Sequence, residues 1–250
     1  MISDTKVVAI GGGTGLSTML KGLKLHTHNI TAVVTVADDG GSSGILRSDL
    51  GMLAPGDVRN CVSALAEVDP VMGELLNFRF KDGSLKGHSL GNLFLAALNE
   101  TSSSFDEAVK KFSHLAGVVG TVYPVTNESV TLSALLEDGR LIEGESHIGV
   151  HHDGPKNGIV KLMVNPEKPK AVDGVIKALE KADIIVLGPG SLYTSIIPNL
   201  LVDGVVDAIK KSNAVKIYVC NIMSQAGETE NYTGSDHLAA IERHSYEGIA

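Results

Sequence analysis

The sequence predicts an α/β protein with a doubly wound, mostly parallel, Rossmann-like sheet and a small antiparallel β insertion. Two observations carry this prediction. Near both ends of the chain, short β-branched runs alternate with amphipathic runs, a rhythm typical of βαβ units and hence of parallel sheets. In between, residues 118–165 alternate polar and apolar positions around turn residues, which favours antiparallel strands. We therefore expect a single domain over residues 1–250, with the β-rich insertion at about 118–165.

The first βαβ unit occupies the start of the chain. Residues 6–10 (KVVAI) are a β-branched run that predicts a strand and ends at a glycine-rich turn. Residues 16–25 place apolar side chains at helical spacing. Residues 30–37 (ITAVVTVA) are nearly all apolar, as in a strand that is buried on both faces. Strand, turn, helix and strand in this order predict two parallel strands of one sheet.

The next segment, residues 38–60, is polar and rich in glycine, and its weak periodicity predicts a long ordered loop. Helices are expected to follow, with Asp57 and Ser89 as the N-caps of two of them. Inside the insertion, the turn sequence EDGR predicts a hairpin. After the insertion the α/β rhythm returns, with a helix, a buried strand at 183–188, a loop that enters a helix, a strand at 216–220, and a polar loop before a last helix.

Composition limits the function classes. Of the 250 residues, 43% are hydrophobic and 20% are charged, an ordinary balance for a soluble globular protein. The formal net charge of −8 and the lack of a basic patch argue against nucleic acid as a partner. No apolar run reaches the about 20 residues of a membrane span, and the N-terminus has no secretory signal, so we expect a cytoplasmic protein without membrane insertion. Cys61 and Cys220 lack metal-ligand spacing and are expected to be buried, reduced thiols.

Four glycines fall in one turn, the sequence GGGTG at residues 11–15, directly after the first predicted strand. Glycine lets a backbone approach an anion and direct N–H groups toward it, and the positive end of the following helix dipole strengthens such a site. Thr14 and Ser17 can add hydroxyl donors. Leu16 stands where the dinucleotide fingerprint has its third glycine, and no Walker A lysine follows. The alternative is a tight turn that only permits close packing of a helix on a strand.

Three more loops of small polar residues follow predicted strands, with the sequences DDGGSSG, GPGSLYTS and NIMSQAGET. Because the carboxyl ends of parallel strands meet at one edge of a sheet, the four loops together predict one shared ligand site. The residues expected to bind the ligand are Gly11, Gly12, Gly13, Thr14, Gly15, Ser17, Asp38, Asp39, Gly40, Gly41, Ser42, Ser43, Arg47, Arg59, Asn60, Asn92, Gly188, Gly190, Ser191, Tyr193, Thr194 and Asn221.

Asp38 and Asp39 end the second predicted strand. An acidic residue at this place can hold ribose hydroxyls, and two adjacent carboxylates can hold Mg²⁺ beside phosphates, which makes this pair the candidate catalytic residues. The alternative is a solvated loop with a capping carboxylate. Arg47 and Arg59 are candidates to bind phosphate through two parallel hydrogen bonds from the guanidinium group. The alternative is that they form ion pairs with nearby acids such as Asp57.

Some side chains leave a site role and a structural role both open. Tyr193 can stack on a base or cap the core, and Asn92 lies in an otherwise apolar helix, where a buried amide needs partners. The cluster His151, His152 and Asp153 has no further ligand at suitable spacing, so a surface turn is favoured over a metal site. No nucleophile with a paired base stands out, which argues against a hydrolase.

Six motifs, GGGTGLS, TVADDGGSSGILR, PGDVRN, GHSLGN, GPGSLYTS and NIMSQAGET, together closely resemble the YvcK-type gluconeogenesis factor family within the CofD-like superfamily. The resemblance covers almost the whole chain. It implies a doubly wound α/β sheet, binding of the nucleotide sugar UDP-N-acetylglucosamine, and a role in cell shape and envelope synthesis during gluconeogenic growth. CofD relatives are transferases that join a phospholactyl group from a guanosine diphosphate donor to a deazaflavin, with Mg²⁺.

The resemblance also implies roles for individual residues. Asp38 and Asp39 would face the diphosphate or its metal, and the glycine loop and Asn221 would line the same cleft. Relatives continue through a further C-terminal portion, which this chain is expected to lack and which can hold ligand contacts. Three functions stay open: a regulatory binder of a nucleotide sugar, a Mg²⁺-dependent CofD-like transferase, and an NAD-binding redox protein. A homo-oligomer and cell-envelope synthesis proteins are the possible protein partners.

Overall fold

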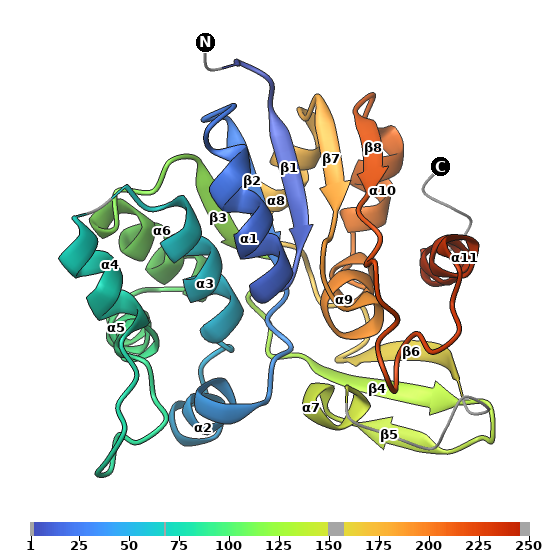
Figure 1. Ribbon diagram of the computed structural model, residues 1–250, viewed down its shortest axis with the longest axis horizontal. Helices are drawn as coiled ribbons and strands as arrows, with labels where there is room; N and C mark the ends of the chain where they lie inside the picture. The colour runs from blue at the N-terminus through green and yellow to red at the C-terminus, as the bar shows by residue number, and fades with distance from the viewer. Residues whose placement is uncertain (1–2, 68, 150–157, 246–250) are drawn as a thin grey trace.

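A computed structural model describes residues 3–67, 69–149 and 158–245 of the chain. It contains a five-stranded sheet with helices on both sides and a separate three-stranded antiparallel sheet (Figure 1). The predicted fold class, a doubly wound α/β sheet with a small antiparallel part, is confirmed.

The five-stranded main sheet has the order β3-β2-β1-β7-β8, and all of its strand pairs are parallel. The chain builds outward from β1 in one direction first and then crosses to β7 on its other side. The switch point of the sheet, where ligands bind in open α/β folds, therefore lies between the carboxyl ends of β1 and β7. The strands are β1 (Val7–Gly11), β2 (Ile30–Val34), β3 (Thr121–Pro124), β7 (Ile184–Leu187) and β8 (Val215–Tyr218).

Some helices from the first half of the chain pack against β1, β2 and β3 and the others pack on these helices, whereas the helices from the second half pack mainly on one another (Figure 1). The apolar core lies between these layers and includes Ile10, Leu16 and Val33, all of which are fully buried. The first group is α1 (Thr14–Leu23), α2 (Gly41–Leu50), α3 (Gly56–Leu65), α4 (Pro70–Asn77), α5 (Leu90–Glu100) and α6 (Phe105–Leu115), and the second is α8 (Asp173–Glu180), η1 (Leu192–Ile196), α9 (Ile197–Leu200), α10 (Val205–Lys211) and α11 (Gly234–His244).

The antiparallel sheet lies across the carboxyl ends of the main sheet (Figure 1). Its strand order is β5-β4-β6, and the short helix α7 follows β5. The hairpin predicted at EDGR is confirmed, because β4 and β5 pair in antiparallel fashion around this turn. The elements are β4 (Thr131–Leu136), β5 (Leu141–Glu143), α7 (Glu145–Ile148) and β6 (Ile159–Asn165).

The insertion is smaller than the predicted range of 118–165. Residues 121–124 form β3, which pairs in parallel with β2 at the edge of the main sheet. As an edge strand, β3 buries only alternate side chains, so its sequence pattern is the same as that of a half-exposed antiparallel strand. The prediction was wrong for these four residues because periodicity reports burial, not strand direction.

The predicted long loop at 38–60 is also wrong in part, because residues 41–50 form α2. Gly and Ser are weak helix formers at its start, and it is the burial of Ser43 and Leu46 against the rest of the fold that stabilises the helix. Asp57 is not an N-cap, since α3 begins at Gly56 after Pro55 and places Asp57 inside its first turn. Ser89 does cap α5, accepting a hydrogen bond from the Asn92 amide.

The two cysteines differ in environment. Cys61 is buried in α3, as predicted, whereas Cys220 is exposed beyond the end of β8. Cys220 follows an edge strand that leaves most of its side chains exposed, so an apolar sequence there did not imply burial.

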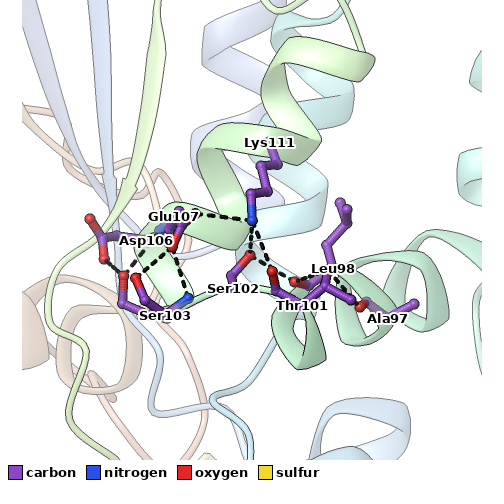
Figure 2. A network of polar contacts seen from close by, with 9 residues as sticks. Ala97, Leu98, Thr101, Ser102, Ser103, Asp106, Glu107 and Lys111 are labelled. Carbon is purple, nitrogen blue, oxygen red and sulfur yellow. Dashed lines mark hydrogen bonds and ion pairs between the residues drawn. The ribbon is translucent and has the colours of Figure 1, made fainter.

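A polar network fixes the turn between α5 and α6 (Figure 2). Lys111 Nζ donates to the Thr101 carbonyl at 3.0 Å and to Ser102 Oγ at 2.9 Å, and it pairs with Glu107 at 3.0 Å. Hydrogen bonds from Ser103, and then from Lys111, lower the pKa of Glu107 to about 2. The network joins α5 to α6, the helix that packs against the edge strand β3.

Candidate functional site

A cleft of about 450 Å³ lies at the switch point of the main sheet. All four predicted loops contribute to it, together with α7 from the small sheet. The predicted residues that line it are Gly12, Gly13, Thr14, Gly15, Asp38, Gly190, Ser191 and Asn221.

The glycine loop is packed so closely that side chains are excluded. A β-carbon at position 13 would lie 2.3 Å from Asp57 Oδ1 and 2.8 Å from its Cα, and one at position 15 would lie 2.5 Å from the Pro189 carbonyl oxygen. Close packing thus accounts for these two glycines, and both still line the cleft. The amino end of α1, which begins at Thr14, lies at the same place, since Thr14 and Gly15 line the cleft, and the first N–H groups of a helix have no partner within the helix.

The adjacent carboxylates Asp38 and Asp39 point in different directions. Asp38 lines the cleft, and its Oδ1 accepts the Gly40 amide at 2.9 Å. Asp39 instead accepts the backbone amides of Glu145 and Ser146, each at 2.9 Å, at the start of α7. The expectation that both carboxylates face a diphosphate or its metal therefore does not hold for Asp39, because its two oxygens accept hydrogen bonds from α7.

Among the described residues, three carboxyl groups face the cleft: Asp38, Asp57 and Glu145. Burial, followed by repulsion from Asp38, raises the pKa of Asp57 to about 7. Burial, followed by repulsion from Asp38, Asp57 and then other acids, raises the pKa of Glu145 to about 8. No lysine or arginine is among the described residues that line the cleft. Near neutral pH the carboxyl groups of Asp57 and Glu145 are therefore protonated for a large part of the time.

The loops after β7 and β8 are tied together. Asn221 Nδ2 donates to the Gly190 carbonyl at 2.9 Å, and Ser191 Oγ donates to Gln225 Oε1 at 2.8 Å. The buried Glu228 accepts the Tyr193 amide at 2.9 Å and the Thr194 hydroxyl at 3.0 Å. These contacts hold the far wall of the cleft opposite the glycine loop.

Several predicted residues support the cleft without lining it. Gly11 ends β1, Ser17 Oγ donates back to the Thr14 carbonyl, and Ser43 Oγ accepts the Gly56 amide. Gly188 has a φ of +83°, a conformation that favours glycine, and turns the chain out of β7. The remaining residues of this kind are Asp39, Gly40, Gly41 and Asn60, the last with its amide nitrogen 2.7 Å from where a β-carbon of Gly13 would stand.

The two predicted phosphate-binding arginines lie elsewhere. Arg47 donates to the carbonyls of Ala37, Asp38 and Val130, and so fixes the loop after β2 against the start of the small sheet. Arg59 is buried and donates to the amide oxygens of Asn92 and Asn77.

Asn92 and Ser42 belong to the same buried network as Arg59, because Asn92 Nδ2 donates to Ser42 Oγ at 3.1 Å and Ser42 Oγ bonds His88 Nδ1 at 3.0 Å. These groups join α2, α3 and α5 beside the cleft. Tyr193 is fully buried, and its hydroxyl contacts the Ile159 carbonyl and Tyr232, so it does not reach a ligand base. Thr194 is buried with it.

Among the described residues, five that line the cleft were not among the residues predicted to bind the ligand. Ser195 and Gln225 stand within two of the quoted loops, and Pro189 stands between two predicted glycines, so their loops were the available signal. Asp57 was interpreted only as a cap or an ion-pair partner. Glu145 had no local signal, because its contact with Asp39 spans 106 positions of the sequence.

The other parts of the described chain contain no comparable group of polar loops around a cleft. A hollow of about 510 Å³ lies between β6 and α9–α10, is lined by no residue of the four loops, and has lysines that are balanced by acids. Among the described residues, no group of three His, Cys, Asp or Glu side chains is arranged to hold a metal, and His151, His152 and Asp153 lie outside those residues. Within the same part of the chain, every helix is too short or too polar to cross a bilayer.

Comparison with known proteins places the chain in one family. The family described as 2-phospho-L-lactate transferase CofD matches residues 7–250. A protein of Clostridium acetobutylicum is 54% identical over 244 residues, which cover 98% of this chain and 54% of that protein. The gluconeogenesis factor of Bacillus subtilis is 47% identical over 242 residues, which cover 96% of this chain and 74% of that protein.

A crystal structure of a UPF0052 family member from Bacillus halodurans superposes with a TM-score of 0.93 at 46% identity. The match covers 99% of this chain and 79% of that one. The chain thus spans between about half and four fifths of the length of these relatives.

Proposed function

Because this chain belongs to the CofD family, among the relatives named gluconeogenesis factors, we propose that it binds a nucleotide sugar, UDP-N-acetylglucosamine, as a regulatory protein. The observation that carries the proposal is the glycine cradle at the switch point. There the amino end of α1 and the loop of Gly12, Gly13 and Gly15 meet the loop after β7 across one cleft. A diphosphate on this cradle leaves its two ends, nucleoside and sugar, to the side walls.

Charge sets a condition on this proposal. A diphosphate that enters a cleft lined by three carboxyl groups needs protons or a cation to offset the repulsion. Protonation of Asp57 and Glu145 meets this need near neutral pH. A regulatory binder can therefore hold the nucleotide sugar without a metal.

The alternative is a CofD-like transferase with Mg²⁺. Asp38 and Asp57 both line the cleft and interact electrostatically, and Mg²⁺ beside phosphates is held by one or two carboxylates, so the residues present fit the ion. When bound, Mg²⁺ would neutralise the charge of a diphosphate leaving group. We favour the binder because no nucleophile paired with a base lines the cleft among the described residues.

The second alternative is an NAD-binding redox protein. Asp38 stands just beyond β2, where dinucleotide folds hold the ribose with an acid. Against this reading, Leu16 replaces the third glycine of the dinucleotide fingerprint, and its side chain is fully buried in the core.

Binding experiments with the purified chain decide among the three functions. We expect UDP-N-acetylglucosamine to bind with similar affinity in EDTA and in excess Mg²⁺, and to remain intact on long incubation. At a hundred times Kd the ligand should add about 2.7 kcal/mol to the free energy of unfolding. Metal-dependent binding with release of UDP would establish the transferase instead, and a rise in melting temperature with NAD alone would establish the redox protein.

Thr14→Ala is expected to weaken binding of UDP-N-acetylglucosamine without abolishing it. Thr14 is exposed at the first position of α1 and lines the cleft. One hydrogen bond to a charged phosphate contributes about 1.5–3 kcal/mol, or about tenfold to hundredfold in affinity by calorimetry. Thr18→Ala, one turn further along the same helix and outside the cleft, is the matched control. Equal affinities of Thr14→Ala and the parent would remove Thr14 from the phosphate contacts.

In cells, the proposed binder would act in the cytoplasm and report nucleotide-sugar supply to cell-envelope synthesis and cell shape during growth on gluconeogenic carbon sources. Its protein partners would then be envelope synthesis proteins or a second copy of the chain. This part of the proposal rests on the family alone.

A further inference from the structure

The short helix α7 brings one residue of the small sheet into the cleft of the main sheet. We propose that Glu145, on α7, is a specificity-determining residue that contacts the hydroxyl-bearing part of the ligand, and that Asp39 is the residue that positions it. The inference rests on the proposed function, because it assigns the part of the nucleotide sugar that this wall of the cleft contacts.

Asp39 connects the two sheets through a defined set of contacts. Its Oδ2 accepts the Glu145 amide and its Oδ1 accepts the Ser146 amide, each at 2.9 Å. Gly144, just before α7, is buried with a φ of +95°, and a β-carbon there would lie 2.9 Å from Asp39 Oδ2. The Gly144 amide also donates to the Leu132 carbonyl in β4 at 2.9 Å. The Asp39 carboxylate therefore fixes the start of α7 against the loop after β2.

The surroundings of Glu145 indicate which ligand group it meets. The charged groups that act on it are all acids: Asp38 and Asp39 from the loop after β2, Asp57 from α3, and Glu228 from the loop after β8. An anionic group of the ligand would be repelled there, and the phosphates already have the glycine cradle. Within the described residues the Glu145 carboxyl has no hydrogen-bond partner, although it lines the cleft. A neutral group that can both donate and accept, such as a sugar or ribose hydroxyl, suits it.

The test compares three ligands by calorimetry: UDP-N-acetylglucosamine, UDP and inorganic pyrophosphate. In Glu145→Ala we expect the affinity for UDP-N-acetylglucosamine to fall by about twofold to tenfold near neutral pH, because a Glu145 carboxyl with a pKa of about 8 is mostly protonated there and its hydrogen bond joins two neutral groups, while the affinity for pyrophosphate is unchanged or higher. A parallel loss for UDP would place the contact at the ribose, and no loss for UDP would place it at the sugar. Glu143→Ala, an exposed acid two residues away in β5, is the matched control and should change nothing.

The positioning role of Asp39 has its own readouts. Asp39→Ala should reproduce the ligand pattern of Glu145→Ala, and the double variant should be no weaker than either single one, because both changes remove the same contact. In the ligand-free protein, Asp39→Ala should speed hydrogen exchange at the amides of Glu145 and Ser146, and Asp39→Asn, which keeps one acceptor, should do so less.

The outcomes separate this inference from the proposed function. Equal losses for pyrophosphate and UDP-N-acetylglucosamine in Glu145→Ala would overturn the specificity role, and additive losses or unchanged hydrogen exchange would overturn the role of Asp39. Failure of the parent protein to bind either uridine ligand would instead overturn the proposed function, and with it the assignment of Glu145, while the exchange measurement would still decide the contact made by Asp39.

Discussion

Gly15→Ala should reduce the affinity for UDP-N-acetylglucosamine by at least about a hundredfold, the largest effect that we expect from a single methyl group in this protein. The new β-carbon would lie 2.5 Å from the Pro189 carbonyl oxygen and 2.9 Å from its carbonyl carbon. Both are backbone atoms, which cannot rotate away as a flexible side chain does. The loops after β1 and β7 must therefore separate, and these two loops form opposite sides of the cleft. Calorimetry measures the loss of affinity.

Gly22→Ala is the matched control for this substitution. Gly22 lies in the same helix, is exposed, and a β-carbon there would meet nothing within 4 Å. We expect unchanged affinity and a gain of about 0.5–1 kcal/mol in the free energy of unfolding, because alanine favours helix more than glycine does. If Gly15→Ala bound the ligand as tightly as Gly22→Ala does, the glycine loop would have a structural role only.

Raising the pH from about 6 to about 9 in EDTA should weaken binding of UDP-N-acetylglucosamine by about a hundredfold. At the lower pH, Asp57 with a pKa of about 7 and Glu145 with a pKa of about 8 are mostly protonated, and at the higher pH both are negative. Each new charge within about 7 Å of a diphosphate costs about 1.4 kcal/mol at an effective dielectric constant of about 35, or about tenfold in affinity. EDTA removes divalent cations that would offset these charges.

Asp57→Asn is the variant that tests this explanation. It leaves one titrating carboxyl group, Glu145, so the loss of affinity across the same pH range should shrink to about tenfold.

The free energy of unfolding of the parent protein should also fall as the pH rises. Because the folded pKa values of Asp57 and Glu145 lie above their ordinary values of 3.8 and 4.5, the folded state holds more protons, and the free energy of unfolding should decrease as the pH rises from about 4 to about 8. A flat affinity profile in the parent would show that these two groups do not face the ligand.

Local patterns in the sequence were sufficient to predict most of the fold. The β-branched runs at 6–10 and 30–37 and the helical spacing at 16–25 predicted the first βαβ unit, because burial on both faces leaves few polar positions in a parallel strand. The four loops could be assigned to one edge from chain order alone. The pattern at 121–124 could not reveal a parallel partner, and the Gly- and Ser-rich start of α2 hid a helix that tertiary packing stabilises.

The candidate site was predictable only where it is built from loops next to strands. The residue type alone does not predict that Arg47 and Arg59 donate to carbonyl and amide oxygens of the protein instead of facing the cleft. A guanidinium group donates equally well to a phosphate ligand and to oxygens of the protein. Nor could it separate Asp38 from Asp39, whose different directions depend on where α7 comes to lie. Glu145 reaches the cleft through a contact of long sequence separation, which no local pattern contains.

The central position of β1 in the sheet affects the order in which the chain can fold. Its neighbour β7 begins at Ile184. Just before these two strands, the Lys6 backbone amide donates a hydrogen bond to the Asp183 carboxylate, 177 positions away in the sequence. Contacts of such separation form late, because a long loop must close before they stabilise the chain. During synthesis, β1 has one parallel neighbour and an open edge until β7 has left the ribosome. The switch-point cleft is therefore complete only after residue 225 has been added, and a ligand that needs the whole cleft can stabilise the protein only from that point.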